Sequence, residues 1–141
     1  MTFPVSVESL NESDTINFAN EFAVTLNQGD IVALNGNLGS GKTFFIKAVC
    51  KNFEIDNVTS PSFAIVNSYD GKYKINHFDF YRIKKIDELY DIGYYDYLND
   101  SSITFIEWAD LFPKLLHKNY YEINIEIDSQ TTRKISIRKY E

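Results

Sequence analysis

With 141 residues, 44% hydrophobic and 16% aromatic, the chain has enough material for one domain with a single core and no room for a second. Its formal net charge of −6 argues against a protein that grips nucleic acid through a broad basic face. The opening residues lack a basic segment, and no apolar stretch approaches the length of a membrane span. We therefore expect residues 1–141 to form one cytoplasmic domain, with Cys50, the single cysteine, in its core.

The first third of the chain is expected to contain an edge strand, a helix and a buried strand. Residues 3–7 alternate in character, as a short edge strand does. A helix capped by Asn11 or Ser13 follows and runs to about Leu26, because its apolar residues recur at helical spacing. Residues 28–30 end this helix and lead into a buried strand at 31–35.

Residues 36–43, Gly-Asn-Leu-Gly-Ser-Gly-Lys-Thr, match the phosphate-loop pattern of Gly, four residues, Gly-Lys and Ser/Thr. In such a loop backbone N–H groups turn toward phosphate oxygens, Lys42 brings a positive charge to the outer phosphates, and Thr43 offers a hydroxyl to Mg²⁺. A helix predicted at 44–53 adds an N-terminus that favours anions. The alternative is a glycine-rich turn that binds nothing, and the strand–loop–helix context disfavours it. The predicted nucleotide contacts are Asn37, Leu38, Gly39, Ser40, Gly41, Lys42 and Thr43.

A hydroxyl-rich segment, Val-Thr-Ser-Pro-Ser-Phe, follows at 58–63, where Pro61 keeps Ser60 extended. Two interpretations stay open: a capped surface loop, or a loop that senses the γ-phosphate or magnesium. Beyond it, residues 63–69 and 73–79 are strand-like and are joined by Asp-Gly-Lys. This spacing predicts an antiparallel hairpin, so the sheet should be mixed.

The segment 77–82, His-Phe-Asp-Phe-Tyr-Arg, places Asp79 at the end of a predicted strand, where α/β folds carry their chemistry. Asp79 is therefore a candidate catalytic acid, and the alternative is a solvated strand end where it pairs with Arg82. We expect His77 to be a core or hydrogen-bonded histidine and not a catalytic base. Residues 84–99 predict two short helices, whose tyrosines favour aromatic packing over a partner surface.

Residues 103–106 are apolar or β-branched and lead directly into Glu107. A buried strand ending in an acid is the arrangement that a magnesium-organising carboxylate requires opposite a phosphate loop. Glu107 is therefore a candidate catalytic and metal-binding residue, with an exposed strand terminus as the alternative. Trp108 either covers a nucleotide or plugs the core.

Near the C-terminus, a helical turn at about 109–116 precedes two alternating segments joined by a turn at 128–132, which predicts a hairpin. The elements together predict an α/β fold. We expect a single-domain, three-layer architecture like that of P-loop NTPases, with a mixed sheet and a C-terminal β-hairpin.

Five motifs occur in order with short spacers: GNLGSGKT, VTSPSFAIVNSY, HFDFYRI, DIGYYDYL and ITFIEWAD. Through them the chain resembles the TsaE (YjeE) family over about residues 9–139. That family comprises small P-loop ATPases that serve bacterial synthesis of threonylcarbamoyladenosine beside the tRNA anticodon. The resemblance implies ATP and Mg²⁺ as cofactors and the threonylcarbamoyl-transferase subunits TsaD and TsaB as partners, with tRNA contacted only through their complex.

Carried onto this sequence, the family's phosphate and magnesium residues fall on Lys42 and Thr43, and its first switch-like loop falls on residues 60–63. Asp79 matches the acid of its His-x-Asp-x-Tyr-Arg motif.

Glu107 and Trp108 match the family's Glu-Trp pair, in which the Glu is linked to magnesium and hydrolysis. Thr15 matches a position where the family tends to have a Thr near the nucleotide, and Arg133 matches its C-terminal basic residue. The resemblance therefore makes both residues candidate nucleotide contacts.

The leading hypothesis is an ATPase in which Thr43 and Glu107 organise Mg²⁺, and Asp79 positions water or couples the nucleotide state to a partner. The resemblance implies that hydrolysis resets the transferase complex between cycles. Turnover alone should be slow, because Arg82 is only a candidate arginine finger. The alternatives are an assembly module without essential hydrolysis, and a small phosphotransferase. The absence of an Arg-rich lid segment disfavours the latter.

Overall fold

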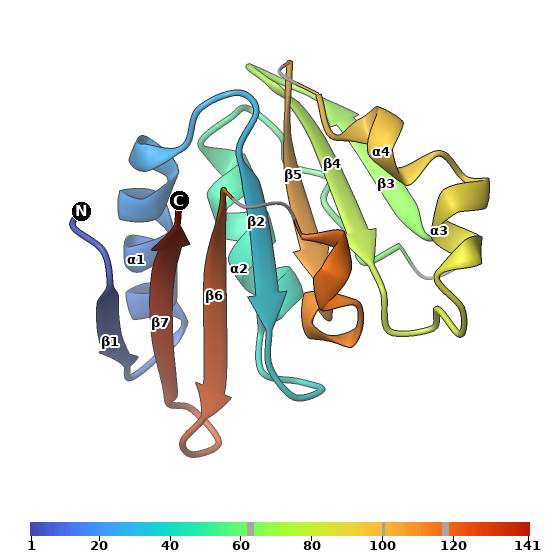
Figure 1. The fold of residues 1–141 in the computed structure, drawn as a ribbon. Helices are drawn as coiled ribbons and strands as arrows, with labels where there is room; N and C mark the ends of the chain where they lie inside the picture. Colours follow the sequence, from blue (N-terminus) through green and yellow to red (C-terminus); the bar gives the residue numbers. More distant parts are fainter. Residues whose placement is uncertain (62–63, 100, 117–118) are drawn as a thin grey trace.

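The computed structural model describes residues 1–61, 64–99, 101–116 and 119–141, which form a seven-stranded sheet with helices on both faces (Figure 1). The strands are β1 (Val5–Ser9), β2 (Ile31–Asn35), β3 (Val66–Asp70), β4 (Lys74–Asp79), β5 (Ser102–Glu107), β6 (Tyr120–Ile127) and β7 (Arg133–Tyr140). The helices are α1 (Glu12–Thr25), α2 (Lys42–Lys51), α3 (Asp87–Asp91) and α4 (Tyr94–Tyr97), with 3₁₀ helices η1 (Ala109–Leu111) and η2 (Pro113–Leu115). The predicted α/β class is confirmed.

The strands lie in the order β1-β7-β6-β2-β5-β4-β3. The central strand β2 pairs in parallel with β5 and β6, and β4 pairs in parallel with β5. The hairpins β3–β4 and β6–β7 are antiparallel, as is the pairing of β1 with β7. The mixed sheet and both predicted hairpins are therefore confirmed. The predicted strand at 63–69 starts in the structure at Val66, and Phe63 lies outside the described residues.

Apolar side chains pack on both faces of the sheet. Behind it in Figure 1, α1 and α2 cover a cluster that includes the rings of Phe18, Phe22 and Phe45. On the opposite face, α3, α4 and the 3₁₀ helices lie over a second cluster, where the ring centroids of Phe78 and Tyr94 are 5.2 Å apart. Because β2 supplies side chains to both clusters, its sequence is apolar without alternation.

Two helix starts shape the region around the glycine loop. At α1, the Asn11 side chain accepts a hydrogen bond from the backbone N–H of Asp14 at 2.9 Å, so Asn11 and not Ser13 is the cap. At α2, Gly41 precedes the first helical residue, Lys42. The helix therefore begins two residues earlier than the predicted 44–53, and the Lys-Thr pair of the loop lies in its first turn.

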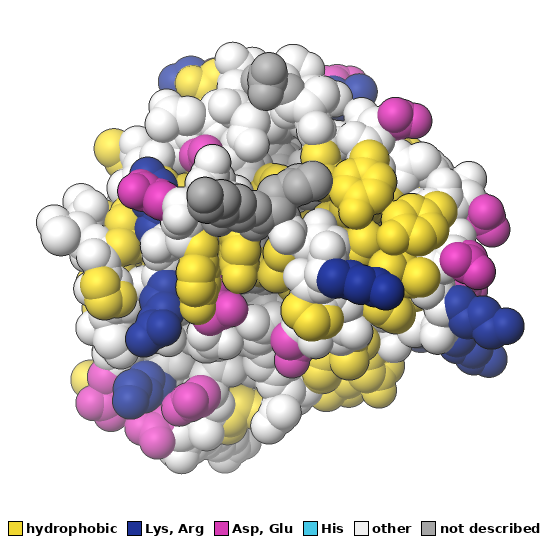
Figure 2. All heavy atoms as spheres, in the orientation of Figure 1, with side chains coloured by type: hydrophobic (Ala, Val, Ile, Leu, Met, Phe, Trp, Pro, Cys, Tyr) yellow, Lys and Arg dark blue, Asp and Glu magenta, His cyan; other side chains and the backbone are white. Residues whose placement is uncertain are grey.

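The tyrosines of α3 and α4 divide between core and surface. Tyr94 is fully buried, whereas Tyr90 and Tyr95 are exposed and their rings stack with centroids 6.1 Å apart. Figure 2 shows hydrophobic side chains gathered over these two helices. Aromatic packing in the core thus explains the presence of Tyr94, whereas Tyr90 and Tyr95 lie on the surface.

The single cysteine lies in the core, as its position in the sequence predicted. Cys50 is fully buried, and this burial raises the pKa of its thiol to about 12, as befits a core residue. Across the described ranges, no helix is both long and apolar enough to cross a membrane.

Candidate active site

The site predicted from the sequence lies at the carboxyl ends of three parallel strands, β2, β5 and β4. β2 leads into the glycine loop, and its neighbour β5 ends at Glu107. In the next strand, β4, Asp79 is the register partner of Glu107. Because neighbouring parallel strands share their carboxyl edge, both acids lie beside the start of α2.

The glycine loop closes tightly against the sheet. A Cβ atom at Gly36 would lie 2.5 Å from Oγ of Ser40 and 2.6 Å from the carbonyl oxygen of Ile125, so no larger residue fits. Gly41 has a left-handed backbone, with φ +108°, which a residue with a side chain adopts only at a cost. These two glycines let the chain turn directly from β2 into α2, with the free N–H groups of the helix facing the loop.

The Lys42 side chain is buried within the loop. Its Nζ donates to the carbonyl oxygens of Gly36 at 2.6 Å and Asn37 at 3.1 Å, and lies 4.1 Å from the ring centroid of Trp108. Burial lowers the pKa of Lys42, and the negative charges of Glu107 and Asp79 oppose that shift. The structure records no ion pair between Lys42 and a carboxylate among the described residues. The ammonium is therefore held by neutral groups that an anion could replace.

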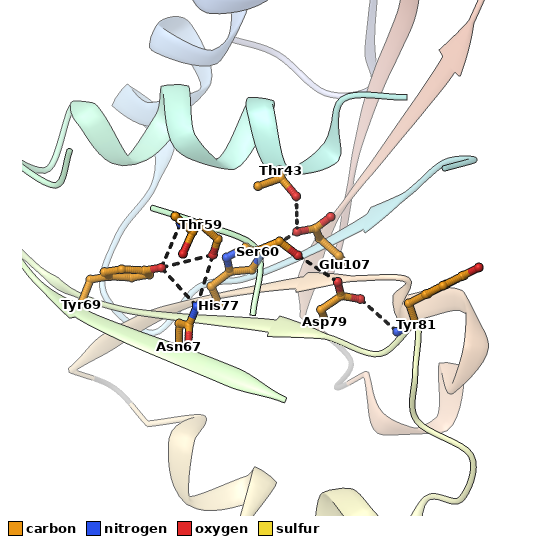
Figure 3. Close-up of polar contacts among 9 residues, drawn as sticks. All are labelled: Thr43, Thr59, Ser60, Asn67, Tyr69, His77, Asp79, Tyr81 and Glu107. Carbon is orange, nitrogen blue, oxygen red and sulfur yellow. Dashed lines mark hydrogen bonds and ion pairs between the residues drawn. The ribbon is translucent and has the colours of Figure 1, made fainter. Parts of the chain in front are cut away.

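Glu107 joins α2 to the sheet. Its Oε2 accepts a hydrogen bond from Oγ1 of Thr43 at 2.8 Å and lies 2.6 Å from Nε2 of His77 (Figure 3). Only 3% of the Glu107 surface is exposed, so the alternative of an exposed strand terminus is wrong. The pairing places the two predicted magnesium residues, Thr43 and Glu107, side by side.

Asp79 lies at the mouth of the same cleft and is half-buried. Its Oδ1 accepts from the backbone N–H of Tyr81 at 2.9 Å, and its Oδ2 accepts a long hydrogen bond from Oγ of Ser60 at 3.4 Å (Figure 3). Burial raises the pKa of this carboxyl, against the lowering effect of the Tyr81 hydrogen bond. Asp79 thus links the end of β4 to the hydroxyl-rich loop.

Trp108 covers the loop lysine from the end of β5. Its backbone is left-handed, with φ +61°, and its N–H donates to the carbonyl of Leu34 at 3.0 Å. Its ring contacts that of Tyr81, with centroids 4.9 Å apart, as well as the Lys42 ammonium. It also packs at the rim of the second apolar cluster, as a partly buried side chain. That Trp108 covers a nucleotide stays a prediction. A non-glycine residue in this conformation carries strain, which is typical of functional sites.

A cleft of about 710 Å³ unites most of the predicted residues. Its lining includes Leu38, Gly39, Gly41, Lys42, Thr43, Asp79, Glu107 and Trp108, together with Ser60 and Pro61 of the hydroxyl-rich loop. Asn37 contributes its carbonyl to Lys42 and is not part of this lining. Ser62 and Phe63, the remainder of the predicted switch-like segment, lie outside the described residues.

Thr15 and Arg133 lie at a second cavity, of about 480 Å³, on the other side of the loop. The Arg133 guanidinium donates to the carbonyls of Ser40 at 2.9 Å and Gly39 at 3.4 Å. Oγ1 of Thr15 is buried and hydrogen-bonds to Oγ of Ser9 at 2.6 Å. Ser40 and Gly41 also line this cavity, so the loop separates two adjoining hollows.

Sequence reasoning predicted that His77 is hydrogen-bonded, but it missed the partner. His77 and Asp79 are two residues apart on β4, so the pleat points both side chains to the face that carries Glu107. This alternation was the available signal, yet it required knowing that β4 and β5 are neighbours. Tyr69 and Asn67, which hydrogen-bond to Thr59 in Figure 3, gave no comparable signal.

The donor set fits a magnesium ion held partly by a nucleotide. Among the described residues, no group of three or more His, Cys, Asp or Glu side chains could hold a metal ion. Mg²⁺ characteristically takes one or two protein oxygens and completes its shell with phosphate oxygens and water. The Thr43 hydroxyl and the Glu107 carboxylate supply oxygens of this kind beside the loop.

The fold and the ends of these strands define a class: an α/β protein with a mixed sheet, in which a glycine loop joins the central strand to a helix. Acids end the two neighbouring strands β4 and β5. Within that class, the chain belongs to the TsaE family. The family's sequence model, described as "Threonylcarbamoyl adenosine biosynthesis protein TsaE", matches residues 9–135. The resemblance from the five motifs is thereby confirmed, and with it the family's role in threonylcarbamoyladenosine biosynthesis.

Individual relatives agree along nearly the whole chain. The chain is 40% identical to the "tRNA threonylcarbamoyladenosine biosynthesis protein TsaE" of Rickettsia typhi, covering 92% of this chain and 91% of the relative. It is 32% identical to the protein of that name in Bacillus subtilis, covering 91% and 81%. The crystal structure of Bacillus subtilis YdiB superposes with a TM-score of 0.81 at 26% identity, covering 100% of this chain and 88% of the other.

Proposed function

We propose that this protein binds and hydrolyses ATP with Mg²⁺ in support of threonylcarbamoyladenosine formation on tRNA. One observation carries the proposal: Lys42 and Thr43 of the loop meet the strand-end acids Asp79 and Glu107 in a single cleft. Phosphoryl transfer depends mainly on positioning and charge stabilisation, so these few groups suffice in kind.

The loop and Lys42 bind the phosphates. Backbone N–H groups at the start of α2 donate to phosphate oxygens. The Lys42 ammonium exchanges the carbonyls of Gly36 and Asn37 for the outer phosphates, which are stronger acceptors because they are charged. Trp108 shields this contact from water, which strengthens it.

Thr43 and Glu107 hold the metal, and Asp79 acts on water. Bound Mg²⁺ neutralises charge on the phosphate oxygens. Thr43 donates its proton to Glu107 and so keeps its oxygen lone pairs available. Burial raises the pKa of Asp79, which brings it closer to the range in which a carboxylate accepts a proton efficiently.

The second cavity takes the nucleoside. It adjoins the loop, and Arg133 contacts the loop carbonyls from its far side. Thr15, Phe44 and Ile125 offer the mixed apolar and polar lining typical of small-molecule pockets. The triphosphate and the base would then lie on opposite sides of the glycine loop.

Hydrolysis resets a complex of the threonylcarbamoyl-transferase subunits TsaD and TsaB, and tRNA is reached only through that complex, in the cytoplasm. The family's place in the pathway supports this. The net charge of −6 agrees with action through proteins and not by holding tRNA directly.

Multiple-turnover tRNA modification tests this proposal, with Lys42→Ala and Glu107→Ala compared with the wild type. We expect both variants to lose tRNA modification. Lys42→Ala lacks the ammonium that binds the phosphates, and Glu107→Ala lacks the carboxylate that binds Mg²⁺. Lys47→Ala, an exposed lysine on the same helix, is the matched control and should behave as the wild type. Full modification by both site variants would contradict the proposal. Many rounds with a non-hydrolysable analogue in place of ATP would instead favour a nucleotide-dependent assembly module.

A further inference from the structure

We propose that His77 is a positioning residue: as the neutral imidazole protonated on Nε2, it donates to Glu107 and fixes that carboxylate against Thr43. The proposal rests on the proposed function only for the role it gives Glu107. It does not require His77 to touch nucleotide, metal or water.

The contact is short and fully enclosed. His77 has no exposed surface, and its Nε2 lies 2.6 Å from Oε2 of Glu107. The two residues come from adjacent parallel strands, and His77 is the register partner of Phe105, two residues before Glu107. The side chains therefore meet diagonally on one face of the sheet, beneath the start of α2, as Figure 3 shows.

The hydrogen-bond partners select the tautomer. Nδ1 of His77 is buried, and no partner for it exists among the described residues. A proton on Nδ1 would be a buried donor without an acceptor, which is unfavourable because the group has lost its hydrogen bond to water. A proton on Nε2 instead faces a carboxylate oxygen, the favourable arrangement at this distance. The form with hydrogen on Nε2 alone leaves no donor of the ring unpaired.

This geometry excludes a proton-accepting role in hydrolysis. Nε2 already carries its proton and is occupied by Glu107, and the ring has no exposed surface through which water could reach Nδ1. What remains is orientation. Oε2 of Glu107 accepts from Thr43 on α2 and contacts His77 on β4, so donors from two elements fix one oxygen of a side chain with three rotatable bonds. Partners of this kind hold metal-binding carboxylates in place.

The first experiment is a long-range ¹H–¹⁵N NMR spectrum of the nucleotide-free protein, which distinguishes the tautomers. The sequence contains two histidines, so His117→Gln leaves His77 as the remaining imidazole signal. We expect the Nε2–H tautomer, with a proton resonance that shifts upfield in Glu107→Gln. A proton on Nδ1 would overturn the proposal whether or not the protein hydrolyses ATP.

The second experiment compares His77→Leu with His77→Gln. Leucine fills space but offers no donor, whereas the glutamine amide can take the place of Nε2–H. We expect His77→Leu to raise the Mg²⁺ concentration for half-maximal hydrolysis about 10- to 100-fold. The KM for ATP should stay within about twofold, since the phosphate-binding groups are untouched. His77→Gln should recover most of the Mg²⁺ dependence.

Three outcomes contradict the proposal: unchanged Mg²⁺ dependence in His77→Leu, an equal rise in KM for ATP, or a His77→Gln variant as impaired as His77→Leu. Denaturant unfolding of the nucleotide-free variants checks that each is folded. If His77→Leu does not fold, the Mg²⁺ dependence of His77→Gln and the tautomer seen by NMR test the role of His77. If the wild type hydrolyses no ATP, the proposed function fails, and the tautomer still decides the role of His77.

Discussion

At the scale of single residues, the burial of Asp79 in the cleft affects both its pKa and the stability of the fold. Its carboxyl is half-buried, and burial raises its pKa above the ordinary value. A group whose pKa is raised in the folded state favours its protonated form there, so its charged form destabilises the fold at neutral pH. This penalty disappears as pH falls through the raised pKa toward the ordinary value of 3.8, which applies to the unfolded chain.

Asp79→Asn should therefore unfold at a higher denaturant concentration than the wild type at pH 7, and the gap should close by about pH 4. The asparagine can still accept from Tyr81, so the main change is the loss of the buried charge. The same variant should lose about 10²- to 10⁴-fold in hydrolysis. Urea unfolding at both pH values checks the first statement. A variant less stable than the wild type at pH 7 would contradict it.

The backbone of Trp108 makes a second residue-scale prediction. At φ +61° an alanine is strained, whereas glycine is not. Trp108→Gly should therefore be more stable than Trp108→Ala by about 1 kcal/mol, the reverse of the order found at most positions. Urea unfolding of the two variants measures the difference, in which the loss of the ring cancels. Equal stability would show that the left-handed conformation is not retained.

At the scale of elements, the hydroxyl-rich loop is hydrogen-bonded to β3 through Thr59. This residue directly precedes Ser60, which contacts Asp79. The Tyr69 hydroxyl accepts from the N–H of Thr59 at 3.1 Å and donates to its carbonyl at 3.3 Å (Figure 3). Asn67 donates to the same carbonyl at 3.3 Å. The next residue, Ser60, hydrogen-bonds to Asp79. The hydrogen bonds of Tyr69 and Asn67 to Thr59 therefore determine where the loop meets the cleft.

Tyr69→Phe should remove the hydrogen bonds between the Tyr69 hydroxyl and Thr59. The free energy of unfolding should change by no more than about 1 kcal/mol, because exposed hydrogen bonds contribute little. We expect faster amide hydrogen exchange at Thr59 and unchanged exchange in the core strand β2. Tyr73→Phe, which removes a hydroxyl beyond the hairpin turn, is the control. Unchanged exchange at Thr59 would show that Tyr69 does not hold the loop.

The sequence predicted the elements whose signals are local, and it missed relations between distant ones. The strand–glycine-loop–helix unit and the strand ending in Glu107 follow from contiguous patterns, which is why both were predicted. The pairing of β4 with β5 and of β2 with both β5 and β6 arises from packing between segments far apart in the chain. The contacts of Glu107 with His77 and of Arg133 with Ser40 depend on that order, so no local pattern could reveal them.

On the scale of the whole molecule, the sheet brings N-terminal, central and C-terminal segments to a single loop. α2 and the ends of β4 and β5 form one side of it, and Arg133 of β7 contacts its other side. Two cavities adjoin the loop, and Gly41 and Phe44 line both of them. We propose that Mg²⁺ and ATP act where these strands meet the loop.

Phosphate release from ATP by the purified protein, alone and with the transferase subunits, tests this most directly. We predict Mg²⁺-dependent release by the wild type and by Lys47→Ala, increased by the subunits. The rate of phosphate release should fall by about 10²-fold or more in Lys42→Ala and Glu107→Ala, because each substitution removes a group that stabilises charge in the transition state. Release that does not depend on Mg²⁺, or that persists undiminished in both site variants, would contradict the account.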